Sequence, residues 1–278
     1  MLTMLDFDPE QTTSIITDFI RSYTERADIT NVVIGLSGGL DSAVVTALAS
    51  QALGKSQVHP IFMPELSTPI QDFEHVRLIS DHLGIEYKTI DISPFIHAIR
   101  KIYPHDVSEV TLGNIKARLR MLLWYGHTDV KNSLICGCSN KTELLIGYFT
   151  KYGDGGSDFM PIGDLYKTQV YRLAEYLDMP RPIIGKAPTA GLWKGQTDEK
   201  ELGISYDKLD RILYGLERKW PKEKIAEKAA VPASEIARVM NMRRISQHKR
   251  SFPLIPKIGL RTVGLDWRSP VQEEDYTL

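Results

Sequence analysis

The amino-acid sequence predicts an α/β fold: a doubly wound parallel sheet of about five strands, with helices on both faces and a helical C-terminal part. Short runs rich in β-branched residues alternate with helical segments up to about residue 150. The chain has 278 residues, of which 42% are hydrophobic, enough to fill one sizeable core. We therefore expect a single domain over 1–278, with an α/β core at about 30–185, a mobile loop at about 186–203 and a helical part at about 204–278.

The first half of the chain supplies the strands and most of the helices that cover them. A leading helix is expected behind Asp8, which is a good N-cap, because a proline and then apolar residues at helical spacing follow it. Gly54 and Gly84 each end a helical run. The predicted strands are 31–36, 58–64, 86–92 and 133–137. The predicted helices are 8–28, 42–53, 69–83, 112–125 and one from about 140, with a short helical piece before 112.

The sequence changes character at Lys151. Two long stretches, 151–169 and 186–203, are rich in glycine and polar residues, and loops of this length in a compact domain are usually functional or mobile. The helices predicted in this half are 170–177, 206–217 and 234–243, and a basic, proline-spaced tail covers 247–262. Because a doubly wound sheet binds its ligands at the carboxyl ends of the strands, the loops after the first and fourth strands are the candidate site.

Composition narrows the classes of function. With 34 Lys and Arg against 35 Asp and Glu, the formal net charge is -1, so the protein as a whole has no positive electrostatic field that would attract nucleic acid. The N-terminal residues lack the pattern of a secretory signal, and no apolar run approaches the roughly 20 residues of a membrane span. Cys136 and Cys138 are too few for a zinc site and poorly spaced for a disulfide, so we expect small reduced core residues. We expect a cytoplasmic protein that binds small molecules, and neither nucleic acid nor a membrane.

The stretch GLSGGLDSA, from Gly35 to Ala43, carries the strongest signal. It has no lysine followed by serine or threonine, and its glycine spacing does not fit the dinucleotide fingerprint. Its glycines, its two hydroxyls and the start of the next helix can still bind phosphate. Asp41 would repel a polyphosphate unless a divalent cation lay between them, so this carboxylate predicts Mg²⁺. The alternative is a tight turn in which Asp or Ser caps the helix.

Residues 37–42, SGGLDS, resemble the pyrophosphate loop of the N-type ATP pyrophosphatases, which cleave ATP between the α and β phosphates to adenylate a carboxylate or carbonyl. Later blocks resemble, in order and spacing, those of the ammonia-dependent NAD synthetases in their archaeal form. The blocks are GNIKARLRM (113–121), FTKYGDGGSD (149–158), LYKTQV (165–170), APTAGLW (187–193), DEKELGISYD (198–207) and QHKR (247–250). The resemblance covers residue 35 to about residue 250.

The resemblance implies an adenine nucleotide alpha hydrolase-like fold, a homodimer, Mg²⁺ as cofactor and ATP as co-substrate. The implied reaction is the last step of NAD biosynthesis, in which the nicotinate carboxylate of deamido-NAD attacks the α phosphorus of ATP, pyrophosphate leaves, and ammonia displaces AMP. Adenylation turns one hard step into two easier ones. Glutamine-dependent relatives carry a fused glutaminase, for which we see no room before Ser37, so ammonia is the expected nitrogen source.

The resemblance also implies roles for particular residues. The residues assigned to ATP are Gly35, Leu36, Ser37, Gly38, Gly39, Leu40, Asp41, Ser42, Cys138, Lys167 and Thr189. Those assigned to deamido-NAD are Arg118, Lys151, Asp158, His248 and Lys249. Asp41 and Glu143 are assigned to Mg²⁺, and Asp41, Lys167 and Thr189 to catalysis. Tyr166, Thr168 and Gly191 depart from the commonest family pattern, which argues against a role for an aspartate at 191.

Several of these residues also have a structural interpretation. Asn140 to Glu143 form a capping-box pattern, Arg118 lies on a basic helical face, and the other charges assigned to deamido-NAD resemble exposed loop or tail charges. Lys186 cannot be separated from a surface lysine. Two other functions stay open. One is a tRNA-thiolating enzyme, which would show other cysteine spacing and a basic surface, and the other is a module that only senses adenine nucleotide or NAD precursors. The two glycine-containing loops are expected to close over bound substrates.

Overall fold

The computed structural model describes residues 5–103, 107–189, 191, 193 and 195–263. Within this part of the chain the sheet has four parallel strands, in the order β3-β2-β1-β4. They are β1 Asn31–Gly35, β2 Val58–Phe62, β3 Lys88–Thr89 and β4 Ser133–Ile135. A parallel bridge between Cys136 and Phe159 lies where a fifth strand would continue the sheet beyond β4. The predicted parallel, doubly wound sheet and the positions of its four strands are thus confirmed.

Side chains of β1 alternate between two separate cores, as a strand buried on both faces requires. Val32 and Ile34 point into the larger core, and Val33 points to the opposite face. The larger core is covered by α1 Pro9–Arg26, α2 Leu40–Leu53, α3 Ile70–Leu83, α7 Lys167–Tyr176 and α8 Arg181–Ile184. The opposite face is covered by α4 Ser93–Ile102 and α5 Glu109–Lys131.

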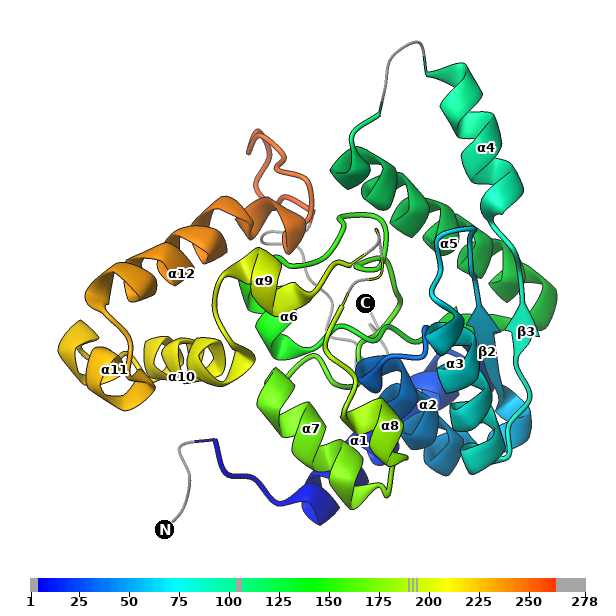
Figure 1. Ribbon diagram of the computed structural model, residues 1–278, viewed down its shortest axis with the longest axis horizontal. Helices are drawn as coiled ribbons and strands as arrows, with labels where there is room; N and C mark the ends of the chain where they lie inside the picture. The colour runs from blue at the N-terminus through cyan, green and yellow to red at the C-terminus, as the bar shows by residue number, and fades with distance from the viewer. Residues whose placement is uncertain (1–4, 104–106, 190, 192, 194, 264–278) are drawn as a thin grey trace.

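A third core holds the helical C-terminal part together. Its helices are α6 Lys141–Ile146, α9 Asp198–Leu202, α10 Tyr206–Glu217, α11 Lys222–Ala229 and α12 Ala233–Ile245. In Figure 1, α10, α11 and α12 lie together at the left, while the sheet lies at the right beyond α7. Ile146 and Tyr166 belong to this core although they lie before the C-terminal helices in the sequence, so the helical part packs directly on the α/β part.

Most predicted helices begin and end within a few residues of their expected bounds. α5 is longer than predicted, because Ser108 caps its start and Asn132 ends it in the left-handed conformation. β3 is shorter, since only Lys88 and Thr89 of the predicted strand pair with β2 at this exposed edge. The sequence pattern does not predict α8, α9 or α11, because four to eight residues contain too few turns for a periodic signal. Two 3-10 turns, Lys55–Gln57 and Gln247–Lys249, complete the described elements.

The strand order creates a switch point between β1 and β4. The chain passes outward from β1 through β2 and β3, and α5 then returns it to β4 on the other side of β1. At such a point the loops after the two strands diverge and leave a crevice for a ligand. Gly35 ends β1 against α5, where a Cβ would lie 2.3 Å from the Trp124 ring, so only glycine fits there.

Among the described residues, no helix combines the length and apolar character needed to cross a membrane.

Candidate active site

A cavity of about 440 Å³ lies at the switch point. Its walls come from the loop after β1, the turn after β4, α5, α6, α7 and the segment from 186 to 201. Of the residues assigned above to ATP or Mg²⁺, those lining it are Gly35, Leu36, Ser37, Gly39, Leu40, Asp41, Ser42, Cys138, Glu143, Lys167 and Thr189. The fold therefore gathers residues from four separate sequence blocks at one place.

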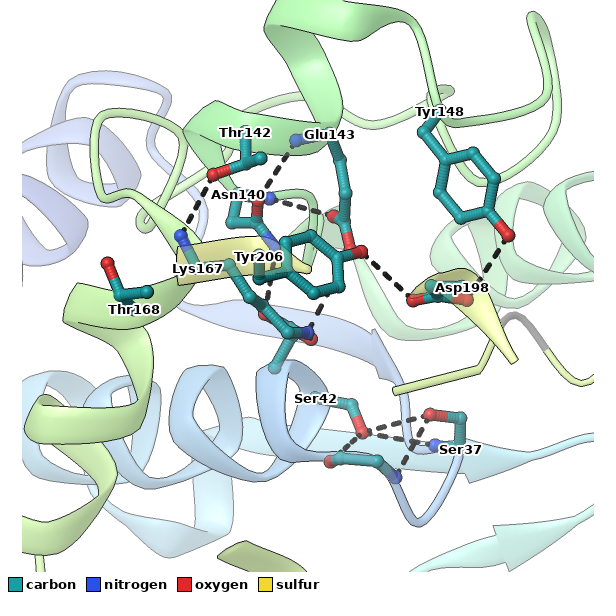
Figure 2. Close-up of polar contacts among 12 residues, drawn as sticks. Ser37, Ser42, Asn140, Thr142, Glu143, Tyr148, Lys167, Thr168, Asp198 and Tyr206 are labelled. Carbon is teal, nitrogen blue, oxygen red and sulfur yellow. Dashed lines mark hydrogen bonds and ion pairs between the residues drawn. The ribbon is translucent and has the colours of Figure 1, made fainter. Parts of the chain in front are cut away.

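The phosphate loop, residues 35–42, is braced by its own serines. Ser42 Oγ donates to Gly39 O at 3.0 Å and accepts from Ser37 N–H at 3.3 Å, and Gly39 N–H donates to Ser37 Oγ at 3.3 Å. Figure 2 shows these contacts at the start of α2. Gly38 has φ +75, and a Cβ there would lie 2.9 Å from Asp72 O. The loop needs glycine at this position, and it presents the N-terminal backbone of α2 to the cavity.

Asp41 and Glu143 share the ammonium of Lys167. Lys167 Nζ contacts Asp41 Oδ2 and lies 4.0 Å from Glu143 Oε1, and the lysine side chain is only 4% exposed. Burial and the negative charge of Asp41 raise the pKa of Glu143 to about 8. Burial opposes the charged form of Lys167, but the two carboxylates outweigh it and raise the pKa of the lysine. A cation shared by two partly buried carboxylates marks the place where positive charge is most favourable.

Glu143 acts both as a helix cap and as a wall of the cavity. Its Oε2 accepts from Asn140 N–H at 3.1 Å, while Asn140 Oδ1 accepts from Glu143 N–H at 3.0 Å, which completes the predicted capping box. The other oxygen, Oε1, faces Lys167. Asn140 is fully buried and also donates from Nδ2 to Asp41 Oδ1 at 3.1 Å. The cap therefore orients both carboxylates, a connection that the sequence pattern alone does not reveal.

The two cysteines are free, as expected, with Cys136 buried and Cys138 half-buried. Burial is the main cause that raises the pKa of both thiols, and the charges of Asp41 and Glu143 add to it at Cys138. Cys138 lines the cavity as a neutral, weakly hydrogen-bonding group. Thr189, on the opposite segment, accepts from Gly191 N–H through Oγ1 at 3.1 Å.

The residues assigned to deamido-NAD are more spread out. Lys249 lines the cavity and donates to Gly147 O and Phe149 O, both at 2.7 Å. His248 is exposed and borders a neighbouring cavity of about 370 Å³ that Lys249 also lines. The remaining three do not line the 440 Å³ cavity.

Those three residues lie in two places. Arg118 is exposed, and its Nε donates to Lys151 O at 3.2 Å, so the arginine side chain reaches the backbone of the half-buried Lys151. Asp158 is half-buried, and its carboxylate accepts from Ile135 N–H at 2.6 Å and from the Tyr125 hydroxyl at 3.3 Å. Its contact with Ile135 also fixes the segment that pairs beside β4.

The sequence pattern predicts no role for Asp198, which is buried in the cavity wall. Its carboxylate accepts from the Tyr148 hydroxyl at 3.2 Å and from the Tyr206 hydroxyl at 3.0 Å, as Figure 2 shows. The Lys167 ammonium lies 5.5 Å from the centroid of the Tyr206 ring. Burial raises the pKa of Asp198, against the lowering effect of Lys167. The block DEKELGISYD contains Asp198 and Tyr206, but nothing in its spacing shows that they meet Tyr148.

Comparison with known proteins identifies the family. A family model described as NAD synthase matches residues 12–253. The NH(3)-dependent NAD(+) synthetase of Methanosarcina mazei is 47% identical over 254 residues, which cover 90% of this chain and 99% of that protein. The protein of the same name from Archaeoglobus fulgidus is 45% identical over 251 residues, which cover 90% and 97%. The matches confirm the resemblance to the archaeal branch and favour it over a tRNA-thiolating enzyme.

Solved structures agree. NMN synthetase from Francisella tularensis has a TM-score of 0.81 and 33% sequence identity, and the match covers 91% of this chain and all of that one. NH3-dependent NAD synthetase from Campylobacter jejuni, in complex with the nitrate ion, has a TM-score of 0.77 and 35% identity over 90% of this chain. Fold, sequence and the placement of the phosphate loop thus agree, and the chain belongs to the NAD synthase family.

Proposed function

We propose that this chain catalyses the ATP-dependent amidation of deamido-NAD by ammonia, through an adenylated intermediate, to give NAD, AMP and pyrophosphate. The observation that carries the proposal is the group of Asp41, Lys167 and Glu143 beside the phosphate loop. The names of the archaeal relatives supply the product and the nitrogen source. A nucleotide with a departing polyphosphate is the substrate that a phosphate loop beside two carboxylates suits best.

Asp41 and Glu143 fit a Mg²⁺ ion that is shared with ATP. Mg²⁺ usually takes one or two protein carboxylates and leaves its other positions to phosphate oxygens and water. In the part of the chain that the structure describes, no three His, Cys, Asp or Glu side chains are grouped to hold a metal. Asp41 and Glu143 already share one cation, the Lys167 ammonium. They can therefore supply the one or two protein carboxylates of a Mg²⁺ site that ATP completes. Mg²⁺ bound there would supply positive charge to the departing pyrophosphate.

Groups of this chain face the negative charge that develops on pyrophosphate in the first step. An oxygen of the nicotinate carboxylate bonds to the α phosphorus, the bond from that phosphorus to its bridging oxygen breaks, and pyrophosphate carries away the electron pair. The N-terminal backbone of α2 and the hydroxyls of Ser37 and Ser42 face this charge. Lys167 stays protonated beside the carboxylates, and Thr189 closes the opposite wall.

In the second step ammonia bonds to the acyl carbon, the bond from that carbon to the AMP oxygen breaks, and the added nitrogen loses a proton. Water that reached the acyl-adenylate would return it to deamido-NAD. We propose that the loop at 186–203 closes over the bound substrates for this reason. Limited proteolysis measures closure: MgATP with deamido-NAD should slow cleavage between Ala187 and Gly203.

The chain is also proposed to act as a homodimer in the cytoplasm. α1 and α5 expose apolar side chains, among them Ile15 at 62%, Phe19 at 44% and Leu122 at 63%. Both helices border the segment at 158–159, since Phe19 packs on Phe159 and Tyr125 of α5 donates to Asp158. An apolar surface of this kind suits a second copy, with Asp158 at its edge. The free thiols suit a reducing compartment.

Product analysis tests the proposed function. The protein is incubated with MgATP, deamido-NAD and ammonium, and NAD, AMP and pyrophosphate are quantified. Equal amounts of the three support the proposal, whereas ADP and phosphate, or no NAD at any ammonium concentration, refute it. Replacing ammonium by glutamine should abolish turnover. Replacing deamido-NAD by nicotinate mononucleotide shows which acid is activated, because the Francisella protein is named for the mononucleotide product.

A further inference from the structure

Lys186 is held between the phosphate loop and the first turn of α3. Its Nζ donates to Gly38 O at 3.1 Å and lies 2.8 Å from Asp72 Oδ1. The side chains of Lys186 and Asp72 are only 12% and 14% exposed, and both line the 440 Å³ cavity. A surface lysine would keep its ammonium in water, so the contacts assign Lys186 to the site.

The backbone around Lys186 fixes its reach. Ile183, three residues earlier, is fully buried in the larger core, and Gly185 N–H closes the short helix α8 on Arg181 O at 2.9 Å. On the other side, Gly38 packs so closely on α3 that a Cβ would lie 2.9 Å from Asp72 O. The phosphate loop, α3 and the start of the 186–203 loop therefore meet at one ammonium group.

The charges of the cavity show why this ammonium matters. The described residues that line it include six carboxylates, namely Asp41, Asp72, Glu143, Asp154, Asp198 and Glu201. The cationic side chains among them are Arg120, Lys167, Lys186 and Lys249. Lys167 sits with Asp41 and Glu143, while Lys249 and Arg120 donate to backbone carbonyls. A polyphosphate adds further negative charge, and Lys186 already donates to the backbone of the phosphate loop at Gly38 O.

We propose that Lys186 is a further phosphate-binding residue and that Asp72 is its positioning residue. When a polyphosphate binds, the ammonium passes from the Asp72 carboxylate to an oxygen of the pyrophosphate part and remains near Gly38. Asp72 holds the long side chain extended before binding, which reduces the rotamer entropy lost when the phosphate contact forms. The same contact anchors the first residue of the 186–203 loop, so phosphate binding and loop position are linked. This inference rests on the proposed function only in taking ATP as the substrate.

Binding of magnesium pyrophosphate tests it by titration calorimetry, with the full-length chain and no turnover. Lys186→Met should weaken binding about tenfold or more, because a charge-assisted hydrogen bond is lost, and Lys186→Arg should keep most of the affinity. Asp72→Asn keeps an Oδ1 acceptor that can still position the ammonium but removes the competing negative charge, so it should leave affinity unchanged or raise it by up to about threefold. Equal weakening by Lys186→Met and Asp72→Asn would show a purely structural tether, and unchanged binding by Lys186→Met would also overturn the proposal.

Two controls complete the experiment. Lys200→Met removes an exposed lysine of α9 from the same loop and should not change pyrophosphate binding. Thermal unfolding of each variant identifies a loss of folding, and if Lys186→Met does not fold, Lys186→Gln, which also removes the charge, is compared with wild type in its place. A wild type that binds magnesium pyrophosphate through Lys186 but forms no NAD refutes the proposed function and supports this inference. NAD formation with Lys186→Met binding like wild type does the reverse.

Discussion

Asp41 is the residue on which the proposed chemistry depends most. Its two oxygens have separate partners, with Lys167 at Oδ2 and Asn140 at Oδ1, so the carboxylate is held in one orientation. Asp41→Asn should lower kcat/KM for NAD formation by about 10²-fold or more, a typical cost of removing a charge from a preorganised site. It should also raise the Mg²⁺ concentration for half-maximal rate. Steady-state kinetics at varied Mg²⁺ measures both, and Asp207→Asn on the exposed side of α10 is the control. Near wild-type turnover at limiting Mg²⁺ would remove Asp41 from the metal site.

Asn140 gives a prediction about positioning rather than chemistry. It is fully buried, caps α6 and donates to Asp41 Oδ1. Asn140→Ala should lower the free energy of unfolding by about 1–3 kcal/mol, from the lost cap and the unpaired buried groups. Asn140→Asp keeps the cap acceptor but places another carboxylate beside Asp41, so it should lose more activity than stability. Urea unfolding and kinetics on both variants check this, and equal stability of Asn140→Ala and wild type would contradict it.

At the residue scale, the sequence predicts which residues carry the proposed chemistry better than it predicts which residues are in contact. Asp41, Glu143 and Lys167 follow from the resemblance, and the structure places them in mutual reach. The Asn140 capping box is predicted from its local spacing, but its contact with Asp41, 99 residues away, is not. Likewise Lys186 and Asp72 are separated by 114 residues and look like unrelated charges until the fold joins them. Only local patterns can be read from residue spacing alone.

Among the elements, α10 is joined to α6 and α7 by one buried carboxylate. Asp210 is fully buried, accepts from the Thr142 hydroxyl at 2.5 Å and from Thr168 N–H at 2.9 Å, and is stabilised further by the charge of Lys167. Burial outweighs these contacts and raises the pKa of Asp210 from 3.8 to about 6. The folded state therefore favours the protonated carboxyl, so the contribution of Asp210 to stability is greatest below pH 3.8 and falls as pH rises through about 6.

The comparison with Asp210→Asn isolates this effect, because the amide does not titrate in the same range. Between pH 4.5 and pH 8, the free energy of unfolding of wild type should fall relative to Asp210→Asn by about 2 kcal/mol. Urea unfolding of both proteins at the two pH values gives the difference directly. A difference that is the same at both pH values would show that Asp210 keeps an ordinary pKa in the fold.

The elements also show where sequence patterns stop being informative. α10 has its predicted bounds, because six of its twelve residues are buried at helical spacing. α11 has eight residues, of which only Ile225 and Ala229 are buried, and α9 has five within a stretch that composition marks as irregular. β3 pairs through two exposed residues. Such elements are stabilised by their neighbours rather than by their own pattern, so they become visible only in the folded chain.

At the scale of the whole molecule, three cores meet around one cavity. The two faces of the sheet supply the phosphate loop and α5, while the C-terminal part supplies Asp198 of α9, which accepts from the Tyr206 hydroxyl behind it. The helical part completes the wall of the site, and the single domain over 1–278 stays a prediction. Removal of the C-terminal helices would therefore open the cavity as well as destabilise the fold.

The proposed homodimer yields the last prediction. Phe19 on α1 and Leu122 on α5 are 44% and 63% exposed, and both helices border the Asp158 segment. Each carries an apolar side chain that a second copy would bury, so replacing both by glutamate places charges in the interface, where desolvation opposes association. The double variant Phe19→Glu, Leu122→Glu should shift from dimer to monomer in light scattering coupled to size exclusion, with at least a tenfold weaker dimer constant, since tenfold corresponds to about 1.4 kcal/mol.

Leu66→Glu, at a side chain 91% exposed in the loop after β2, should leave the mass unchanged. A wild type that elutes as a monomer at all concentrations, or a double variant that remains dimeric, would place the interface elsewhere or remove it. If dimerisation is lost, KM for deamido-NAD should rise more than KM for ATP. Asp158 lies beside the proposed dimer surface, whereas the phosphate loop lines the cavity within one copy of the protein.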